Sequence, residues 1–366
     1  VDSNTTWEKV EHKNIGIDFG FFDNALTGSF DVFQRDTRDM LGPSVALADF
    51  FGAVAPETNN AEMRNRGWEL TLQWRGKIGK DIDYSIGGSL SDATSEVTAY
   101  EGDGSDPANN WYKGKKVGEI WGYRASGLIQ TQEEADEYNA TYDLSYLSGQ
   151  KWMPGDVKYI NLDDNNKINN GTNTIGDMGD MTVIGNTTPR YQYTINGSIS
   201  WKGLSLSLMF QGVGKRDWCP AMNTSYFWGS GAYAQVTVFK EHLDYWTPEN
   251  PNAYYPNPYT AGNQAVGKFR AKTSQKSDRY MQSAAYCRLK NLTISYDLPK
   301  TWIEKIHLTK AQVFFSGENL LTFTKLSNIF DPEGLFTQNS YGNALEQAGK
   351  NYPMTRVFSV GVILNM

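Results

Sequence analysis

Apolar and polar residues alternate with a period of two in nine segments of the chain, which is the pattern of β-strands with one apolar face. In residues 190–201, one face carries aromatic and branched residues, while the other carries Gln192, Asn196 and smaller polar residues. The two-residue turn at 202–203 then leads into a second such segment, with glycine where a positive φ is favoured. The remaining segments lie near residues 15–21, 26–32, 68–75, 82–91, 292–298, 311–318 and 358–365.

The predicted strands are long, and the connections between them alternate in length. Many of the segments approach the 9–11 residues that cross a bilayer in a tilted strand, whereas strands of soluble proteins are usually nearer 5–6 residues. Short connections at 22–25, 76–81, 202–203 and 299–307 alternate with long ones at 34–66, 92–189, 212–285 and 319–356. Outer-membrane barrels show this order, with short periplasmic turns and long external loops. The sequence therefore predicts an all-β fold, a transmembrane antiparallel β-barrel.

The direction of the strands predicts that the barrel is larger than this chain. A short turn follows the first strand, so that strand ends at the periplasmic side, and the ninth strand ends there as well. An even-stranded barrel with a periplasmic N-terminus then needs an odd number of further strands. We therefore expect residues 1–366 to be the C-terminal part of a barrel whose earlier strands precede Val1.

Composition and charge argue against several other classes of protein. The formal net charge is -7 and no basic cluster is present, so nucleic acid is not an expected partner. Cys219 and Cys287 are far apart and predict neither a zinc site nor a disulfide framework. No run of about 18 apolar residues predicts a transmembrane helix. We find no arrangement of carboxylates or nucleophiles that predicts catalysis, and we do not expect an enzyme.

Aromatic residues gather in the long connections, outside the alternating segments. Flat aromatic faces suit sugar rings, and amphipathic rings also suit protein interfaces. The alternative role is to form small cores that stabilise long loops. The candidates for contact with a substrate or a partner are Trp111, Tyr112, Trp121, Tyr123, Trp218, Tyr226 and Trp228.

One stretch of the longest connection, DVKYINLDDNNKIN at 156–169, has the spacing of the start of a calcium-binding loop. Position twelve of such a loop is normally Glu and is Thr172 here. The affinity for a metal ion should therefore be weak unless the carboxylate of Asp177 or Asp180 folds back onto the loop. We predict a weak Ca²⁺ or Mg²⁺ site and no required cofactor. The alternative is a turn-rich Asn/Asp loop without an ion. The candidate ligands are Asn161, Asp163, Asn165, the carbonyl of Lys167, and Asn169.

Five segments together match one family of proteins in order and spacing. They are NRGWELTLQWRGKIGKDIDYSIGGSLS (65–91), GDVKYINLDDNNKI (155–168), IGNTTPRYQYTINGSISWKGLSLSLMFQG (184–212), CRLKNLTISYDLPK (287–300) and VFFSGENLLTFTKLSNIFDPEG (313–334). The chain resembles, over nearly its whole length, the final third of the SusC/RagA-type TonB-dependent transporters of Bacteroidetes outer membranes.

The resemblance implies a 22-stranded barrel with an N-terminal plug, of which this chain is the C-terminal barrel portion. It implies import of large nutrients across a Gram-negative outer membrane, usually oligosaccharides and sometimes peptides. The implied partners are a SusD-like surface lipoprotein, outer-membrane lipid, and TonB through an N-terminal part that is absent from this chain. One departure is Met366, because such chains commonly end in an aromatic residue.

Two other functions are consistent with the residues alone. The first is a soluble β-rich carbohydrate-active enzyme or lectin whose loops bind glycans, although the ordered alternation of short and long connections argues against it. The second is a passive porin, which needs neither a plug nor a lipoprotein. The sequence upstream of Val1 would distinguish these possibilities from an importer.

Overall fold

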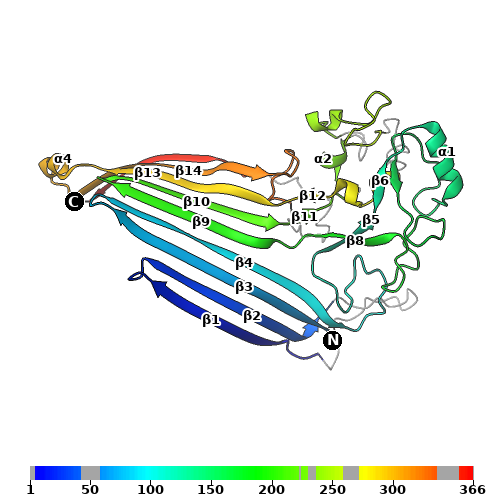
Figure 1. Ribbon diagram of the computed structural model, residues 1–366, viewed down its shortest axis with the longest axis horizontal. Helices are drawn as coiled ribbons and strands as arrows, with labels where there is room; N and C mark the ends of the chain where they lie inside the picture. The colour runs from blue at the N-terminus through cyan, green and yellow to red at the C-terminus, as the bar shows by residue number, and fades with distance from the viewer. Residues whose placement is uncertain are drawn as a thin grey trace.

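The computed structural model describes residues 5–42, 58–221, 224–229, 236–258, 272–335 and 354–365. Nine long strands form one antiparallel sheet in the order β1-β2-β3-β4-β9-β10-β13-β14-β15 (Figure 1). Each strand pairs with its neighbour along the chain within this sheet, so all nine predicted strands are confirmed. They are β1 (Lys9–Phe21), β2 (Leu26–Leu41), β3 (Asn59–Ile78), β4 (Ile82–Tyr100), β9 (Arg190–Trp201), β10 (Leu204–Lys215), β13 (Tyr286–Asp297), β14 (Lys310–Thr324) and β15 (Val357–Asn365).

One end of the sheet carries the short connections. Phe22, Asp23 and Asn24 have φ values of 54°, 54° and 65°, and the N–H of Ala25 closes the turn by donating to the carbonyl of Phe22 at 3.0 Å. The turn at 202–203 has φ values of 47° and 87°, as a type I′ hairpin turn requires. The helix α4 (Lys300–Ile303) and the 3₁₀ turn η5 (Glu304–Ile306) lie at the same end, opposite the long connections (Figure 1).

Strands β2 and β3 extend beyond the predicted segments. The prediction of a loop beginning at Gln34 and ending at Arg66 was wrong at both of its ends, because β2 continues to Leu41 and β3 begins at Asn59. The apolar alternation stops there, but the strands remain paired and charged side chains face one another. The Nε of Arg64, for example, lies 2.5 Å from Oδ1 of Asp36 on the neighbouring strand.

The two faces of the sheet differ in chemistry. One face exposes apolar side chains along the strands, including Leu72, Ile86 and Ile195. The other face carries small polar residues that hydrogen-bond across strands, as between the hydroxyls of Ser89 and Thr194 at 2.7 Å. An apolar face exposed along long strands is the surface that a transmembrane strand presents to lipid.

The long connections fold into a separate packed body, which we call the loop domain: the described residues of 101–189, 216–285 and 325–335. It contains three two-stranded sheets, the helices α1 and α2, and the 3₁₀ turns η3 and η4 (Figure 1). Among the described residues, no helix is long and apolar enough to span a membrane. The bounds are β5 (Glu119–Tyr123) with β8 (Met181–Asn186), β6 (Ala125–Leu128) with β7 (Val157–Tyr159), β11 (Asp217–Trp218) with β12 (Gln282–Ser283), α1 (Gln132–Thr141), α2 (Ser225–Trp228), η3 (Lys240–Leu243) and η4 (Asp278–Tyr280).

Candidate functional site

The loop domain has an aromatic core to which three of the four long connections contribute, those after β4, β10 and β14. The ring of Phe227 is fully buried and lies 6.0 Å from that of Trp218, 5.4 Å from Tyr255 and 6.5 Å from Phe330 between centroids. Phe330 belongs to the connection after β14, while the connection between β4 and β9 contributes Tyr159 to the same buried cluster. Because one core joins the three connections, the external loops form one body rather than three independent flaps.

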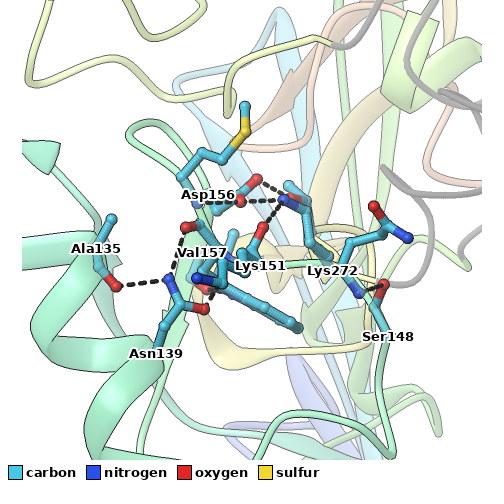
Figure 2. Close-up of polar contacts among 11 residues, drawn as sticks. Ala135, Asn139, Ser148, Lys151, Asp156, Val157 and Lys272 are labelled. Atoms are coloured by element: carbon cyan, nitrogen blue, oxygen red, sulfur yellow. Dashed lines mark hydrogen bonds and ion pairs between the residues drawn. The ribbon is translucent and has the colours of Figure 1, made fainter.

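A buried ion pair joins the connection between β10 and β13 to the connection between β4 and β9. The Nζ of Lys272 lies 2.5 Å from Oδ2 of Asp156 and donates to the carbonyl of Lys151 at 2.8 Å (Figure 2). The two side chains are only 2% and 0% exposed. Asp156 also accepts the N–H of Met153 at 2.8 Å. Both charges are thus hydrogen-bonded, which a buried pair requires if it is not to destabilise the fold.

The helix α1 is attached to this network through Asn139. Its side-chain amide donates to the carbonyls of Ala135 at 2.6 Å and Trp152 at 2.8 Å, while its Oδ1 accepts the N–H of Trp152 at 2.8 Å (Figure 2). The ring of Trp152 lies beneath Lys272, with Nζ 5.6 Å from the ring centroid. Asn139, Asp156 and Lys272 were not predicted from the sequence, because no periodic pattern marks contacts that join such distant segments.

Three of the seven aromatic candidates are buried in the core. The side chains of Tyr123, Trp218 and Trp228 are at most 4% exposed. Burial also raises the pKa of the Tyr123 hydroxyl well above its usual range. The structure therefore supports packing, the alternative role that the sequence left open, for these three residues, and it leaves little of their surface for direct contact with a ligand.

The other four candidates are half-buried. Trp111 packs edge-on against Tyr100 at the end of β4, and Tyr226 packs against Phe239, with ring centroids 6.4 Å and 5.5 Å apart. Tyr112 meets Trp121 edge-on at 6.4 Å, and the hydroxyl of Tyr112 donates to Oε2 of Glu119 at 2.5 Å. Burial is the main cause of the raised pKa of Tyr112. A role for these four residues in contacting a substrate or partner stays a prediction.

The candidate metal ligands form a series of side-chain-to-backbone turns. Oxygens of the side chains accept backbone N–H groups two or three residues further along, and Asp164 and Asn166 adopt left-handed φ values of 58°. The oxygen atoms are therefore already used as acceptors. The bonds run from the N–H of Asp164 to Asn161 (2.7 Å), of Asn165 to Asp163 (3.2 Å), of Lys167 to Asn165 (2.8 Å) and of Gly171 to Asn169 (2.7 Å).

Asp180 closes this loop from a distance. Its carboxylate accepts the N–H of Leu162 at 2.6 Å and that of Asn169 at 2.9 Å, so it ties the two ends of the loop together. Burial raises the pKa of Asp180. In the described part of the chain, no group of three or more His, Cys, Asp or Glu side chains is placed to hold a metal ion. A weak Ca²⁺ or Mg²⁺ site stays a prediction.

Residues 2–320 match the family model described as TonB dependent receptor-like, beta-barrel. The chain is 29% identical over 383 residues to the TonB-dependent receptor P3 of Formosa agariphila, covering all of this chain and 35% of that protein. It is 20% identical over 337 residues to the TonB-dependent receptor SusC of Bacteroides thetaiotaomicron, covering 91% of this chain and 30% of that protein.

Solved structures share the fold. The RagAB peptide importer in its open-open state superposes with a TM-score of 0.70 at 21% identity, covering 99% of this chain and 35% of that chain. The structure of the RagAB peptide transporter gives a TM-score of 0.68 at 23% identity, covering 98% and 35%. The chain thus spans about a third of the length of the proteins that it matches.

Proposed function

Because the chain belongs to the TonB-dependent receptor-like β-barrel family, whose members are integral outer-membrane transporters, we propose that it is the C-terminal barrel portion of a SusC/RagA-type importer. The plug and the earlier strands then lie outside this chain. TonB energises import through that N-terminal part. The family is not one of enzymes or soluble lectins, so the carbohydrate-active enzyme considered from the sequence is not proposed.

The observation that carries this proposal is the division of the chain into a lipid-facing sheet and a folded loop domain. The described residues of the loop domain pack around their own buried core, so they offer a preformed external surface rather than separate flexible loops. A preformed surface lowers the entropic cost of binding a second protein. We propose that a SusD-like lipoprotein binds this surface and covers the barrel.

We propose that the substrate is an oligosaccharide. The half-buried rings of Tyr112 and Trp121, which meet edge-on, support this choice, because flat aromatic faces suit sugar rings. Peptide import is the alternative, and the RagAB structures are described as those of a peptide transporter.

Uptake by whole cells tests the function and the substrate together. We expect a strain that lacks the full-length receptor to lose uptake of fluorescent oligosaccharides and to regain it on complementation, with peptide uptake unchanged. Loss of peptide uptake instead would favour the alternative substrate. No defect with either substrate would contradict an importer. Co-elution of a lipoprotein with the tagged receptor, lost when the loop domain is unfolded, tests the proposed partner.

A further inference from the structure

The apolar face of the sheet ends abruptly on strands β1 to β4, on the side of the loop domain. Residues paired across strands lie on the same face, so the register defines rows across the sheet. The last apolar row contains Ile15, Val32 and Trp68 and meets Asp92 on β4. The next row toward the loop domain contains Lys13, Gln34, Arg66 and Thr94. Rings such as Trp68 mark the membrane interface in outer-membrane barrels, so this polar row lies at headgroup level.

A hollow of about 570 Å³ lies at this boundary and is lined by both rows and by Arg190. Its lining carries three cations, Lys13, Arg66 and Arg190, and one carboxylate, Asp92, so the formal charge of the lining is +2. Arg190 binds Asp92 through both Nε and Nη2. Arg66 instead donates to the neutral amide oxygen of Gln34 at 2.8 Å, which leaves the guanidinium charge uncompensated by that bond. This excess of positive charge stands on a chain whose net charge is -7.

The carboxylates of the following row are already paired, two of them with cations outside the hollow and Glu11 with both Lys13 and Arg38. Asp36 pairs with Arg64 at 2.5 Å, Glu96 pairs with Lys116, and Glu11 is shared by Lys13 at 3.0 Å and Arg38 at 3.3 Å. Of the three cations that line the hollow, Arg66 is thus the one that forms no ion pair with a carboxylate of the described residues, whereas Lys13 is shared with Glu11 and Arg190 is paired with Asp92. Arginine also offers the forked donor geometry that matches phosphate oxygens.

A second, apolar hollow of about 540 Å³ follows directly along the same strands, within the lipid-facing belt. Its first row, Leu70, Leu90 and Tyr193, is the one next to the Trp68 row. Its floor is backbone at Gly88, which lies between Leu72 and Ile195. A Cβ at Gly88 would come within 2.4 Å of the carbonyl oxygen of Thr194, so this position has no room for a side chain.

We propose that the two hollows form one binding site for a lipid of the external leaflet that carries a phosphorylated headgroup. The phosphate lies in the cationic hollow beside Arg66 and Lys13, and an acyl chain lies in the groove over Gly88. Basic residues at a membrane surface attract anionic headgroups, and the apolar groove adds burial of hydrocarbon. This inference is independent of the nutrient that the receptor imports.

Native mass spectrometry of the delipidated full-length receptor, with defined lipids added back, tests the site. The probes are dioleoyl phosphatidic acid and dioleoyl glycerol, which share acyl chains and differ in the phosphate. We expect the wild-type receptor to prefer phosphatidic acid. The double variant Lys13→Gln with Arg66→Gln should lose roughly 30-fold in affinity for it, since each basic residue near an anionic lipid contributes about 1 kcal/mol. Filling the apolar groove with Ile195→Trp should also weaken binding of phosphatidic acid.

The matched control is Lys77→Gln with Lys202→Gln, which removes two positive charges at the opposite end of the strands and should leave binding unchanged. A heat-modifiable band on gels verifies that each variant forms its barrel. Equal binding of the two lipids by the wild type, or unchanged binding of phosphatidic acid by either site variant, would overturn the proposal. Displacement of phosphatidic acid by millimolar inorganic phosphate would show a free-phosphate site and would overturn it as well.

Discussion

The sheet and the loop domain place their apolar side chains in opposite ways: the sheet exposes them on one face, and the loop domain buries them in a core. In the sheet, apolar side chains such as Val360 are 82% exposed on one face, and hydrogen bonds between neighbouring strands hold the structure together. In the loop domain, rings such as Phe227 are turned inward and surrounded by other rings. The difference follows from the solvent, because lipid covers the apolar face of the sheet whereas the loop domain meets water. An exposed apolar side chain is therefore expected on the lipid-facing side of the sheet, whereas in the loop domain it would be in contact with water.

The largest expected effect of a single change is on the buried ion pair of the loop domain. Replacing Lys272 by Met removes the cation that pairs with the buried Asp156 carboxylate, and we expect a loss of about 3–5 kcal/mol in the stability of the loop domain. Faster limited proteolysis of the loops in the full-length receptor would report it, with the barrel band unchanged on gels.

Two further variants sharpen this result. The double variant Lys272→Met with Asp156→Leu should recover most of the lost stability, because apolar residues can replace a buried pair. Lys77→Met, which removes an exposed partner of Asp83, should have little effect. If Lys272→Met leaves the proteolysis rate unchanged, the ion pair does not hold the two connections together.

The sheet should be sensitive to charge on one face only. Leu72→Arg places a cation in the lipid-facing belt and should destabilise the barrel by about 2–4 kcal/mol near the bilayer midplane. The neighbouring Thr71→Arg lies on the opposite face and should cost much less. The fraction of heat-modifiable barrel in isolated outer membranes measures both, and equal loss in the two variants would contradict the assignment of faces.

Calcium should have a smaller effect, confined to the loop domain. If the loop at 161–169 binds Ca²⁺ with a millimolar dissociation constant, 10 mM CaCl₂ should stabilise it by roughly 1.4 kcal/mol. We expect slower proteolysis of the wild type in calcium and no such change in Asp163→Ala with Asn165→Ala. Isothermal titration calorimetry provides a direct measurement, and an absence of heat with the wild type would favour the alternative of a turn-rich loop without an ion.

The smallest expected effect is a pH dependence at His242. Its Nδ1 accepts the N–H of Phe239 at 3.1 Å, and its Nε2 lies 3.0 Å from the carbonyl of Phe227. Burial lowers the pKa of the imidazole, so its stabilising contribution is present above the usual pKa near 6.5 and is lost as the pH falls through the lowered value. Between pH 7.5 and 5, we expect a loss of about 1 kcal/mol or less in the wild type.

The variant His242→Gln controls this prediction, because glutamine keeps a polar side chain and does not titrate in that range. Hydrogen exchange of the backbone near Phe227 would follow the local loosening in both proteins. Identical pH dependence in the wild type and the variant would mean that another group titrates.

The sequence was sufficient to predict the nine-stranded sheet because each strand has an apolar face and therefore a period of two. The prediction failed beyond Val32 and before Trp68, where polar and charged residues predominate on both faces of β2 and β3 and the period disappears although the strands continue. The loop domain could not be predicted for a related reason. The bond between Asp156 and Lys272 joins residues 116 positions apart, and no local pattern encodes such a contact.

The same reasoning explains the outcome for the aromatic candidates. Composition alone identified a concentration of rings in the loops, but it could not separate Trp218, which is buried, from Tyr112, which is only half-buried. Asp180 was noted only as a residue that could fold back, and the structure shows its carboxylate joining Leu162 to Asn169. Contacts of this kind form only when the chain has folded, so the spacing of residues in the sequence does not reveal them.

The shared core of the loop domain has a consequence for grafting and for natural recombination. Because Phe227 and Phe330 come from different connections and pack in one cluster, exchanging a single connection with a relative would leave rings without their complementary surfaces. Chimeras that exchange all three connections together, with crossovers inside the paired strands, keep both the hydrogen-bonded ladder and the core intact. We therefore expect the loop domain to be exchangeable only as a whole, with the strands as the frame that carries it.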